Sequence, residues 1–467
     1  MIAGDVMKRV LWKFRGGAFF FLLIHLAGLH VPARAFPTPE ARSANARHLI
    51  ICVDGVGFST IEEMRAEGRF KLFRSTSRMI APFPSLTNLA LGEILQPAGA
   101  SEPSGYEDNY FDTTRNKMRG GLLDRFRGNR FIKGTFRELF DYHPSALKSG
   151  LGYAAPPVST YVESLTDIQR LKQKFRASRE PIFFAYTGAS DSLAHLGGKR
   201  LLKSFLVRLD ETIKDLAREE GGRLEVTIFS DHGNDFKAYR RISLKSTLRR
   251  AGFKLDDKLK HERSVVLPQF GLVGCAVMWT REENEARLAS VASRVRGVDF
   301  AAYEKQGVVY VLNERGTATL ERRGERFRYR ATQGDPFELS TVVESMRARG
   351  KTDVEDFIAD EDWFAATIES ARPDVLRRVY EGVSERVGHR ADVLLNFVDG
   401  YYTGSASLDV FAFLQATHGN LGAQQSFGFV MSTARALPPH LRARDVWRAL
   451  DSPILGKSRK HTEEAPR

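Results

Sequence analysis

The chain has 467 residues, of which 42% are hydrophobic and 27% charged, and its formal net charge is +13. Its 32 Phe, 13 Tyr and 4 Trp supply enough apolar surface for a sizeable core, which excludes an intrinsically disordered chain. The two Cys exclude a disulfide scaffold and a cysteine-based zinc finger. The basic excess favours anionic partners, but no nucleic-acid-binding motif accompanies it.

The N-terminal segment has the pattern of a cleavable secretory signal. Basic residues precede the apolar run 18–29, and Ala33-Arg34-Ala35 follows it as an A-x-A cleavage site. The run is short for a membrane span, which needs about 20 residues. We therefore predict a signal peptide at 1–35 and a periplasmic or secreted mature chain. The alternative is a membrane protein anchored by residues 18–29, and only then would the membrane be a partner.

Three short apolar runs, at 48–53, 182–186 and 226–229, each end in acidic or polar residues. Runs of this length without alternation are typical of strands buried on both faces of a parallel sheet. The stretch 199–220 between two of them has apolar residues at helical spacing. The sequence therefore predicts an α/β fold: a doubly wound, mostly parallel sheet with helices on both faces. In such sheets the ligand site lies beyond the carboxyl ends of the strands.

The predicted secondary-structure pattern changes between residues 237 and 390. Strands of a meander are predicted at 308–312, 318–320 and 326–330, after a helical stretch at 282–295. We interpret 237–390 as an inserted α+β cap subdomain, and we expect a strand at 392–397 to return to the main sheet. The catalytic core is then 36–236 and 391–455, and 456–467 is a flexible tail.

The candidate metal ligands are carboxylates and imidazoles at or soon after the predicted strand ends. They are Asp54, Asp191, His195, Asp231, His232 and His418. Asp191 and His195 are four residues apart, so a helical turn puts them on one face. Such a ligand set suits Zn²⁺ or Mn²⁺. Taken singly, an Asp after a strand is often a helix cap and a lone His often a core residue.

Thr87 lies just before the helix-like stretch 89–95. The start of a helix favours an anion, and a hydroxyl there can act as a nucleophile when a metal lowers its pKa. The alternative is that Thr87 or Ser85 only caps the helix.

Five motifs occur in the order of a known family: VDGVG at 53–57, PSLTN at 84–88, DSLAH at 191–195, SDHG at 230–233 and THG at 417–419. In these motifs the chain resembles the alkaline phosphatase superfamily, and most closely its type I phosphodiesterase/nucleotide pyrophosphatase branch. PSLTN is also similar to phosphonoacetate hydrolase. The resemblance covers residues 47–234 and 392–433.

The resemblance implies two divalent metal ions, with zinc as the expected metal, and a small phosphate ester as the substrate. It places Asp54, Thr87, Asp231 and His232 around one ion. It places Asp191, His195 and His418 around the other. Thr87 is then the nucleophile, and the Asn88 amide helps to hold the transferred group.

We therefore predict an exported two-metal hydrolase of phosphate esters, a phosphodiesterase or nucleotide pyrophosphatase that acts through a phosphothreonine intermediate. The alternatives are a phosphomonoesterase, a phosphonate hydrolase, or an idle ligand-binding protein with the same fold. The segment 99–110 departs from the family pattern, which predicts a different substrate pocket. No cation flanks Thr87 in the sequence, which favours a diester over a dianionic monoester.

Overall fold

The computed structural model describes residues 46–120, 136–144, 157–404 and 414–449. The predicted signal peptide at 1–35, the alternative anchor at 18–29 and the tail at 456–467 lie outside these residues and stay predictions. None of the helices in the described ranges is long and apolar enough to cross a membrane.

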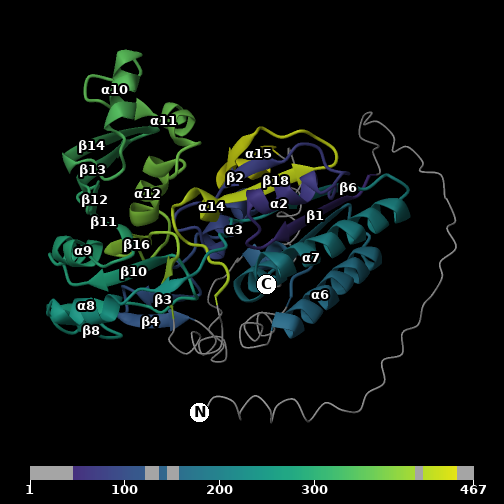
Figure 1. The fold of residues 1–467 in the computed structure, drawn as a ribbon, viewed down its shortest axis with the longest axis horizontal. Coiled ribbons are helices and arrows are strands. Elements are labelled where there is room, and N and C mark those ends of the chain that lie inside the picture. Colours follow the sequence, from purple (N-terminus) through teal and green to yellow (C-terminus); the bar gives the residue numbers. More distant parts are fainter. Residues whose placement is uncertain (1–45, 121–135, 145–156, 405–413, 450–467) are drawn as a thin grey trace, which may run out of the picture. The chain divides into compact units, whose positions relative to one another are not determined.

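Six of the described strands form the main sheet (Figure 1). In spatial order they are β19 (His440–Arg442), β2 (Ser77–Ile80), β18 (Phe427–Ser432), β6 (Glu225–Phe229), β1 (His48–Val53) and β5 (Ile182–Thr187). β1 pairs in parallel with β5 and β6, and β19 pairs in parallel with β2. β18 runs antiparallel to both of its neighbours. The predicted mostly parallel sheet is confirmed.

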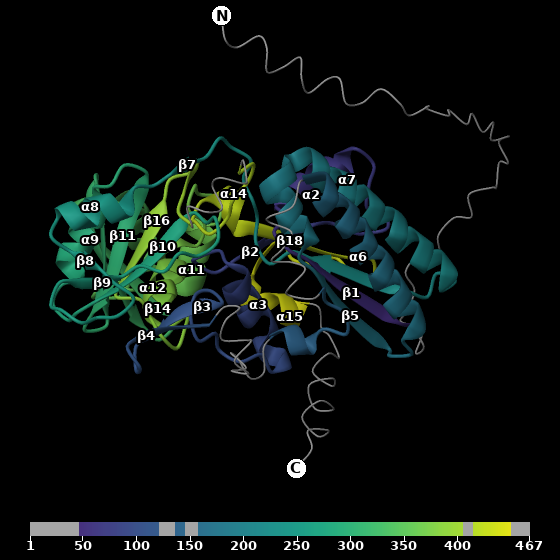
Figure 2. The ribbon, with the colours of Figure 1, turned by 90° about the horizontal axis from the view of Figure 1, so that it is seen from below.

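Helices cover both faces of this sheet because the side chains of β1 alternate between two apolar clusters. Ile51 and Val53 belong to a cluster with helices α2 (Phe58–Ala66), α6 (Pro157–Ala177) and α7 (Ala189–Glu219). Ile50 and Cys52 pack with helices α3 (Thr87–Leu95) and α15 (Val446–Ala449). In two orthogonal views α6 and α7 lie side by side (Figures 1 and 2). The doubly wound arrangement is therefore confirmed.

The described helices are α2 (Phe58–Ala66), α3 (Thr87–Leu95), α6 (Pro157–Ala177), α7 (Ala189–Glu219), α8 (Leu244–Arg250), α9 (Glu285–Ser293), α10 (Ser340–Ala348), α11 (Asp360–Thr367), α12 (Val375–Ser384), α14 (Ala423–Ser426) and α15 (Val446–Ala449). Short 3-10 helices occur at η1 (Gln96–Ala98), η2 (Phe136–Leu139) and η3 (Ala443–Asp445). α7 begins ten residues earlier than the predicted stretch 199–220, so it includes Asp191 and His195.

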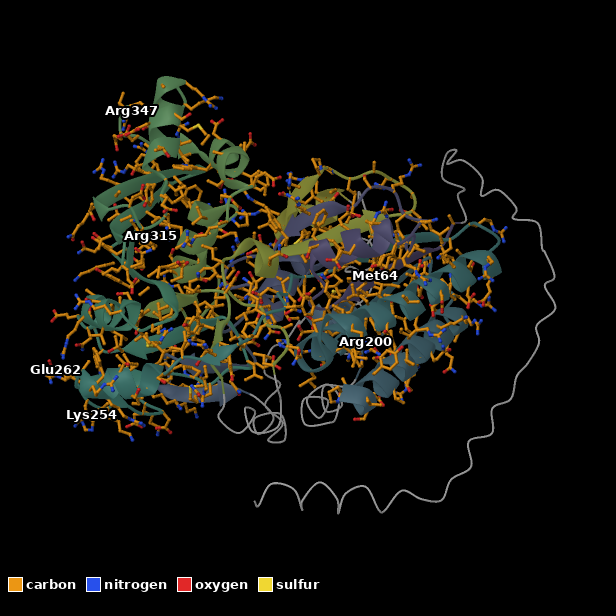
Figure 3. All side chains as sticks on the ribbon, in the orientation of Figure 1. Met64, Arg200, Lys254, Glu262, Arg315 and Arg347 are labelled. Atoms are coloured by element: carbon orange, nitrogen blue, oxygen red, sulfur yellow. The ribbon has the colours of Figure 1, made fainter. Side chains whose placement is uncertain are left out.

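A second, nine-stranded sheet holds the predicted meander. Its order is β15 (Ile358–Ala359), β14 (Arg326–Gly334), β13 (Gly316–Arg323), β12 (Val308–Asn313), β11 (Val298–Lys305), β16 (Val393–Phe397), β10 (Cys275–Thr280), β9 (Ser264–Val266) and β8 (Lys254–Leu255). The side chains of Lys254 and Arg315 project outward from this region (Figure 3). Two small sheets pair β3 (Asn109–Asp112) with β4 (Lys117–Gly120) and β17 (Tyr401–Tyr402) with β7 (Arg240–Arg241).

The prediction that the strand at 392–397 returns to the main sheet is wrong. β16 pairs antiparallel with β10 and β11 in the second sheet. Every residue of β16 is buried. The sequence pattern of such a buried apolar strand does not indicate which of the two sheets it joins. β16 follows the predicted cap subdomain in the chain, but it belongs to the second sheet. The boundaries of the cap subdomain at 237 and 390 stay a prediction.

An ion-pair network joins helix α12, which packs against the second sheet, to α3 and η3 beside the main sheet. Glu381 of α12 accepts hydrogen bonds from Arg377 at 2.8 Å and from Arg444 at 3.2 Å, and it also pairs with Arg386. Arg386 in turn pairs with Glu93 of α3. Burial by itself raises the pKa of Glu381, but the three arginines outweigh it and lower the pKa to about 2.

We expect Glu381→Gln to lower the stability of the protein at pH 7 and to weaken its acid sensitivity. A carboxylate whose folded-state pKa is depressed stabilises the fold above its ordinary pKa, and this stability is lost as pH falls from 4.5 toward about 2. The contribution at pH 7 is about 3 kcal/mol. Urea unfolding between pH 2 and 7 measures it, with the exposed Glu344→Gln as control. Parallel pH profiles for the wild type and Glu381→Gln would contradict this account.

Candidate functional site

The predicted metal ligands come together at the carboxyl ends of the main-sheet strands. Asp54 follows β1 directly, and Asp231 and His232 follow β6 after Ser230. Asp191 lies in the first turn of α7, immediately after β5. His418 arrives from the loop before α14.

The short linkers after the strands allow these groups to approach one another. Gly55 has φ +65°, a region that favours glycine, and a Cβ at this position would lie 2.4 Å from Asp191 Oδ1. His195 Nε2 lies 3.1 Å from Asp191 Oδ2, so the prediction that one helical turn puts the two on one face is confirmed. The backbone of Gly419, next to His418, bridges to Ser85 in the segment before α3.

Each of the three histidines donates a hydrogen bond from Nδ1 to a backbone carbonyl. The acceptors are Ala416 for His195 at 2.7 Å, Gly233 for His232 at 3.0 Å and Ser85 for His418 at 2.9 Å. A carbonyl oxygen can only accept, so Nδ1 must carry the proton. In the neutral imidazole, Nε2 then keeps its lone pair. This is the arrangement that metal-binding histidines adopt in proteins.

Two groups of described side chains could each hold a metal ion. One consists of Asp54, Asp231 and His232, the other of Asp191, His232 and His418, and within each group the ligand atoms lie within 4.8 Å of one another. His195 is in neither group, but its Nε2 contacts the carboxylate of Asp191, a member of the second group. The sets agree in outline with the two predicted ligand sets, but His232 is shared between them. The assignment of individual ligands stays a prediction.

The electrostatics of the site fit divalent cations. Burial, followed by the charges of Asp231 and Asp191, raises the pKa of Asp54 well above its ordinary value. Burial also raises the pKa of Asp231 to about 6, and its buried Oδ2 has no hydrogen-bond partner among the described residues. Carboxylates that repel one another in a buried space are stabilised by a shared cation.

The histidines are held neutral or paired with a carboxylate. Burial, followed by the charge of His232, lowers the pKa of His418 to about 3, and burial lowers that of His232. Burial opposes ionisation of Asp191, but His195 and His418 outweigh it and hold the pKa of Asp191 well below its ordinary value. His232 and His418 stack at 4.0 Å between ring centroids. Neutral imidazoles and ionised carboxylates are the forms that bind zinc.

Thr87 is the first residue of α3, and its hydroxyl faces the first metal-ligand group. Oγ1 donates to Asp54 Oδ1 at 3.2 Å and lies 3.2 Å from His232 Nε2. The predicted start of a helix at this residue is confirmed. Asn88 is buried, and its Nδ2 donates to Glu107 Oε2 at 3.4 Å and to Asp108 Oδ1 at 3.3 Å.

Sequence reasoning missed several neighbours of these residues. Tyr186 of β5 donates its hydroxyl to Asp54 Oδ2. Asn234 donates to Asp191 Oδ1 at 3.2 Å and to the Gly55 carbonyl at 2.6 Å. Asn234 continues the SDHG motif and could have been found there, whereas nothing in the sequence relates Glu107 or Asp108 to Asn88.

No family model and no curated protein sequence matches the chain. Solved structures similar to it include the murine and human ectonucleotide pyrophosphatase/phosphodiesterase 5. Each is 12% identical to this chain, with a TM-score of 0.47. Each match covers 87% of this chain, together with 95% of the murine chain and 94% of the human chain. Phosphonoacetate hydrolase from Sinorhizobium meliloti 1021, in complex with phosphonoacetate, is 14% identical, with TM-score 0.45, 93% of this chain and 100% of that chain covered. These solved structures are members of the alkaline phosphatase superfamily, in its nucleotide pyrophosphatase/phosphodiesterase branch, which is the group that the motifs of this chain resemble.

Proposed function

We propose that this protein is a metal-dependent hydrolase of phosphate esters that acts on diesters through Thr87. The observation that supports this best is the position of the Thr87 hydroxyl, 3.2 Å from both Asp54 Oδ1 and His232 Nε2. The same residue begins a nine-residue helix, whose first backbone N–H groups favour an anion. A hydroxyl, a metal-ligand group and an anion site therefore meet at one point.

We propose that the site binds two divalent metal ions and that both are zinc. Asp54, Asp231 and His232 would hold one, and Asp191, His195 and His418 the other. When bound, such ions lower the pKa of a coordinated oxygen and stabilise negative charge on phosphoryl oxygens.

The chain's own groups then have distinct tasks. Thr87 Oγ1 attacks phosphorus, so that the Thr87 Oγ1–P bond forms as the bond from phosphorus to the first alcohol oxygen breaks; the Thr87 hydroxyl proton is lost, and the first ester group leaves as an alcohol that carries one proton. Water then cleaves the phosphothreonine and releases the second ester group as a monoester. Asp54 accepts the hydrogen bond that orients the Thr87 hydroxyl, and the hydroxyl of Tyr186 holds the other oxygen of Asp54. Asn88 lies one residue from Thr87, and its amide would donate to a phosphoryl oxygen in place of one of its two present acceptors, Glu107 and Asp108.

The surroundings of Asn88 favour a diester. A monoester dianion needs an additional cation, yet the neighbours of the Asn88 amide are the carboxyl groups of Glu107 and Asp108. Arg137 lies 3.6 Å from Asp108 and is engaged by this carboxylate. Burial and the charge of Asp108 raise the pKa of Glu107 to about 8, so most of the Glu107 carboxyl is protonated at neutral pH. A diester anion carries one negative charge fewer than a monoester dianion, so the carboxyl groups beside Asn88 repel it less.

We expect kcat/KM for bis-nitrophenyl phosphate to exceed that for the nitrophenyl monoester at least about tenfold, which is about 1.4 kcal/mol in the transition state. Asp108→Asn should raise the monoester rate relative to the diester rate, because it removes a charge that repels the dianion. Glu102→Gln, an exposed acid in the same segment, is the matched control. A tenfold preference for the monoester would assign the protein to the phosphomonoesterases instead.

A further inference from the structure

Two adjacent arginines of α12 are buried in different ways. Arg377 is 2% exposed and Arg378 is 3% exposed. Arg377 donates to carboxylates, those of Asp360 and Glu381, both at 2.8 Å. Arg378 donates to neutral oxygens, which are the carbonyls of Pro373, Leu421 and Pro82 and the hydroxyls of Ser85 and Ser426.

The partners of Arg378 lie in the two segments that carry Thr87 and His418. Nη2 lies 3.4 Å from the Pro82 carbonyl and 3.2 Å from Ser85 Oγ, so it contacts the segment that leads into α3. Nη1 lies 3.4 Å from the Leu421 carbonyl, three residues after His418. One guanidinium thus joins both segments, which are more than 300 residues apart in the chain.

Ser85 continues this connection to the metal-ligand group. Its hydroxyl accepts from Arg378 and donates to the Asn420 carbonyl at 3.0 Å. Its carbonyl accepts the Nδ1–H of His418 at 2.9 Å, which sets the direction of the imidazole. A displacement of Ser85 would therefore move Thr87 and turn His418 together.

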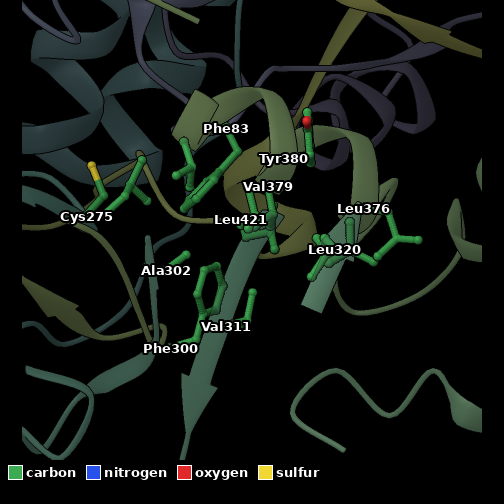
Figure 4. Packing of buried hydrophobic residues seen from close by; sticks show 14 of the residues in the cluster. Phe83, Cys275, Phe300, Ala302, Val311, Leu320, Leu376, Val379, Tyr380 and Leu421 are labelled. Carbon is green, nitrogen blue, oxygen red and sulfur yellow. The ribbon is translucent and has the colours of Figure 1, made fainter. Parts of the chain in front are cut away.

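The apolar side of α12 packs against the same segments. Val379 lies close to Leu421, with Phe83 near the same helix (Figure 4), and all three belong to one buried cluster. The helix approaches the segment so closely that a Cβ at Gly382 would lie 2.5 Å from the Phe83 carbonyl oxygen. The position of Arg378 relative to this segment is therefore set by close packing.

We propose that Arg378 is a positioning residue, which holds the Ser85 segment and the Leu421 loop in the geometry that places Thr87 and His418 in the site. This inference rests on the proposed function for its activity readout, but its geometric part can be measured without it. Only the guanidinium fork can bond both segments, because a lysine ammonium at the same place cannot span them.

The test compares Arg378→Lys with Arg377→Lys in the full chain. Both variants keep a positive charge on the same helix, and both lose a buried fork. We expect Arg378→Lys to lower kcat for a nitrophenyl phosphodiester and the affinity for Zn²⁺ by about ten- to a hundredfold, with KM changed about twofold or less. Amide exchange at residues 85–88 and 417–421 should become faster. Arg377→Lys should lower the melting temperature but leave kcat, Zn²⁺ affinity and exchange in these two segments near wild type.

Ser426→Ala is the second variant, because it removes the 2.7 Å hydrogen bond that Ser426 accepts from Arg378, together with the 3.1 Å hydrogen bond from Ser426 to the Leu421 carbonyl, and leaves every charge in place. It should shift the same quantities in the same direction by a smaller factor. Unchanged exchange and Zn²⁺ affinity in both Arg378→Lys and Ser426→Ala, or equal losses in Arg377→Lys, would overturn the proposal. A wild-type protein that cleaves no phosphate ester would refute the proposed function, whereas exchange and Zn²⁺ binding would still decide the role of Arg378.

Discussion

Replacing Thr87 with Ala is expected to reduce kcat for phosphodiester cleavage by at least about a thousandfold, because it removes the attacking oxygen. The fold should tolerate the change, since within the described part of the chain the Thr87 hydroxyl bonds only to the site residues Asp54 and His232. The melting temperature and the Zn²⁺ content should therefore stay close to those of the wild type. Single-turnover kinetics with a nitrophenyl diester measures the loss.

Thr87→Ser is the matched control, because it keeps a hydroxyl at the start of α3. It should retain part of the activity and should form the same kind of covalent phosphoenzyme, which mass spectrometry of a quenched reaction can detect. A Thr87→Ala variant with near-wild-type rates would mean that water attacks phosphorus directly.

Asp231→Asn is expected to have opposite effects on activity and on the stability of the metal-free protein. Asp231 is fully buried, and its Oδ2 has no hydrogen-bond partner among the described residues. Loss of its charge should empty one metal position and lower kcat about a hundredfold or more. Elemental analysis of purified protein, together with kcat/KM, measures both effects.

The metal-free protein should respond in the other direction. Burial raises the pKa of Asp231 from 3.8 to about 6, so the folded state binds its proton more tightly than the unfolded state. Stability of the metal-free wild type should therefore fall as pH rises from 3.8 to 6, and Asp231→Asn should remove this loss. After chelation, Asp231→Asn should be more stable than the wild type at pH 7 by about 1–3 kcal/mol.

Asp235→Asn provides the comparison. Asp235 is also buried, and burial together with the charge of Asp399 raises its pKa to about 7. It belongs to neither metal-ligand group, so its substitution should stabilise the metal-free protein without changing the metal content. Equal metal contents in wild type and Asp231→Asn would contradict the role proposed for Asp231.

Local pattern was sufficient to predict the elements that carry the site. The apolar runs at β1, β5 and β6 and the helix that begins at Thr87 depend on residues near one another in the chain. Because parallel strands end at one edge of a sheet, the acidic groups that follow them converge without further information. The spacing of Asp191 and His195 works in the same way, since one helical turn joins them.

Pairings between distant segments were decided only by the tertiary structure. β16 is as apolar as a strand of the main sheet, but it pairs with β10 and β11, because strand order depends on packing and not on composition. The contacts of Tyr186 with Asp54 and of Arg378 with Ser85 join segments that are more than 100 residues apart in the chain. The contact of Glu107 with Asn88 spans fewer residues, but no local pattern indicates it. The residue types at the site follow from the sequence, and their orientation follows from tertiary contacts, such as Tyr186 with Asp54 at the main sheet and Arg378 of α12 with Ser85.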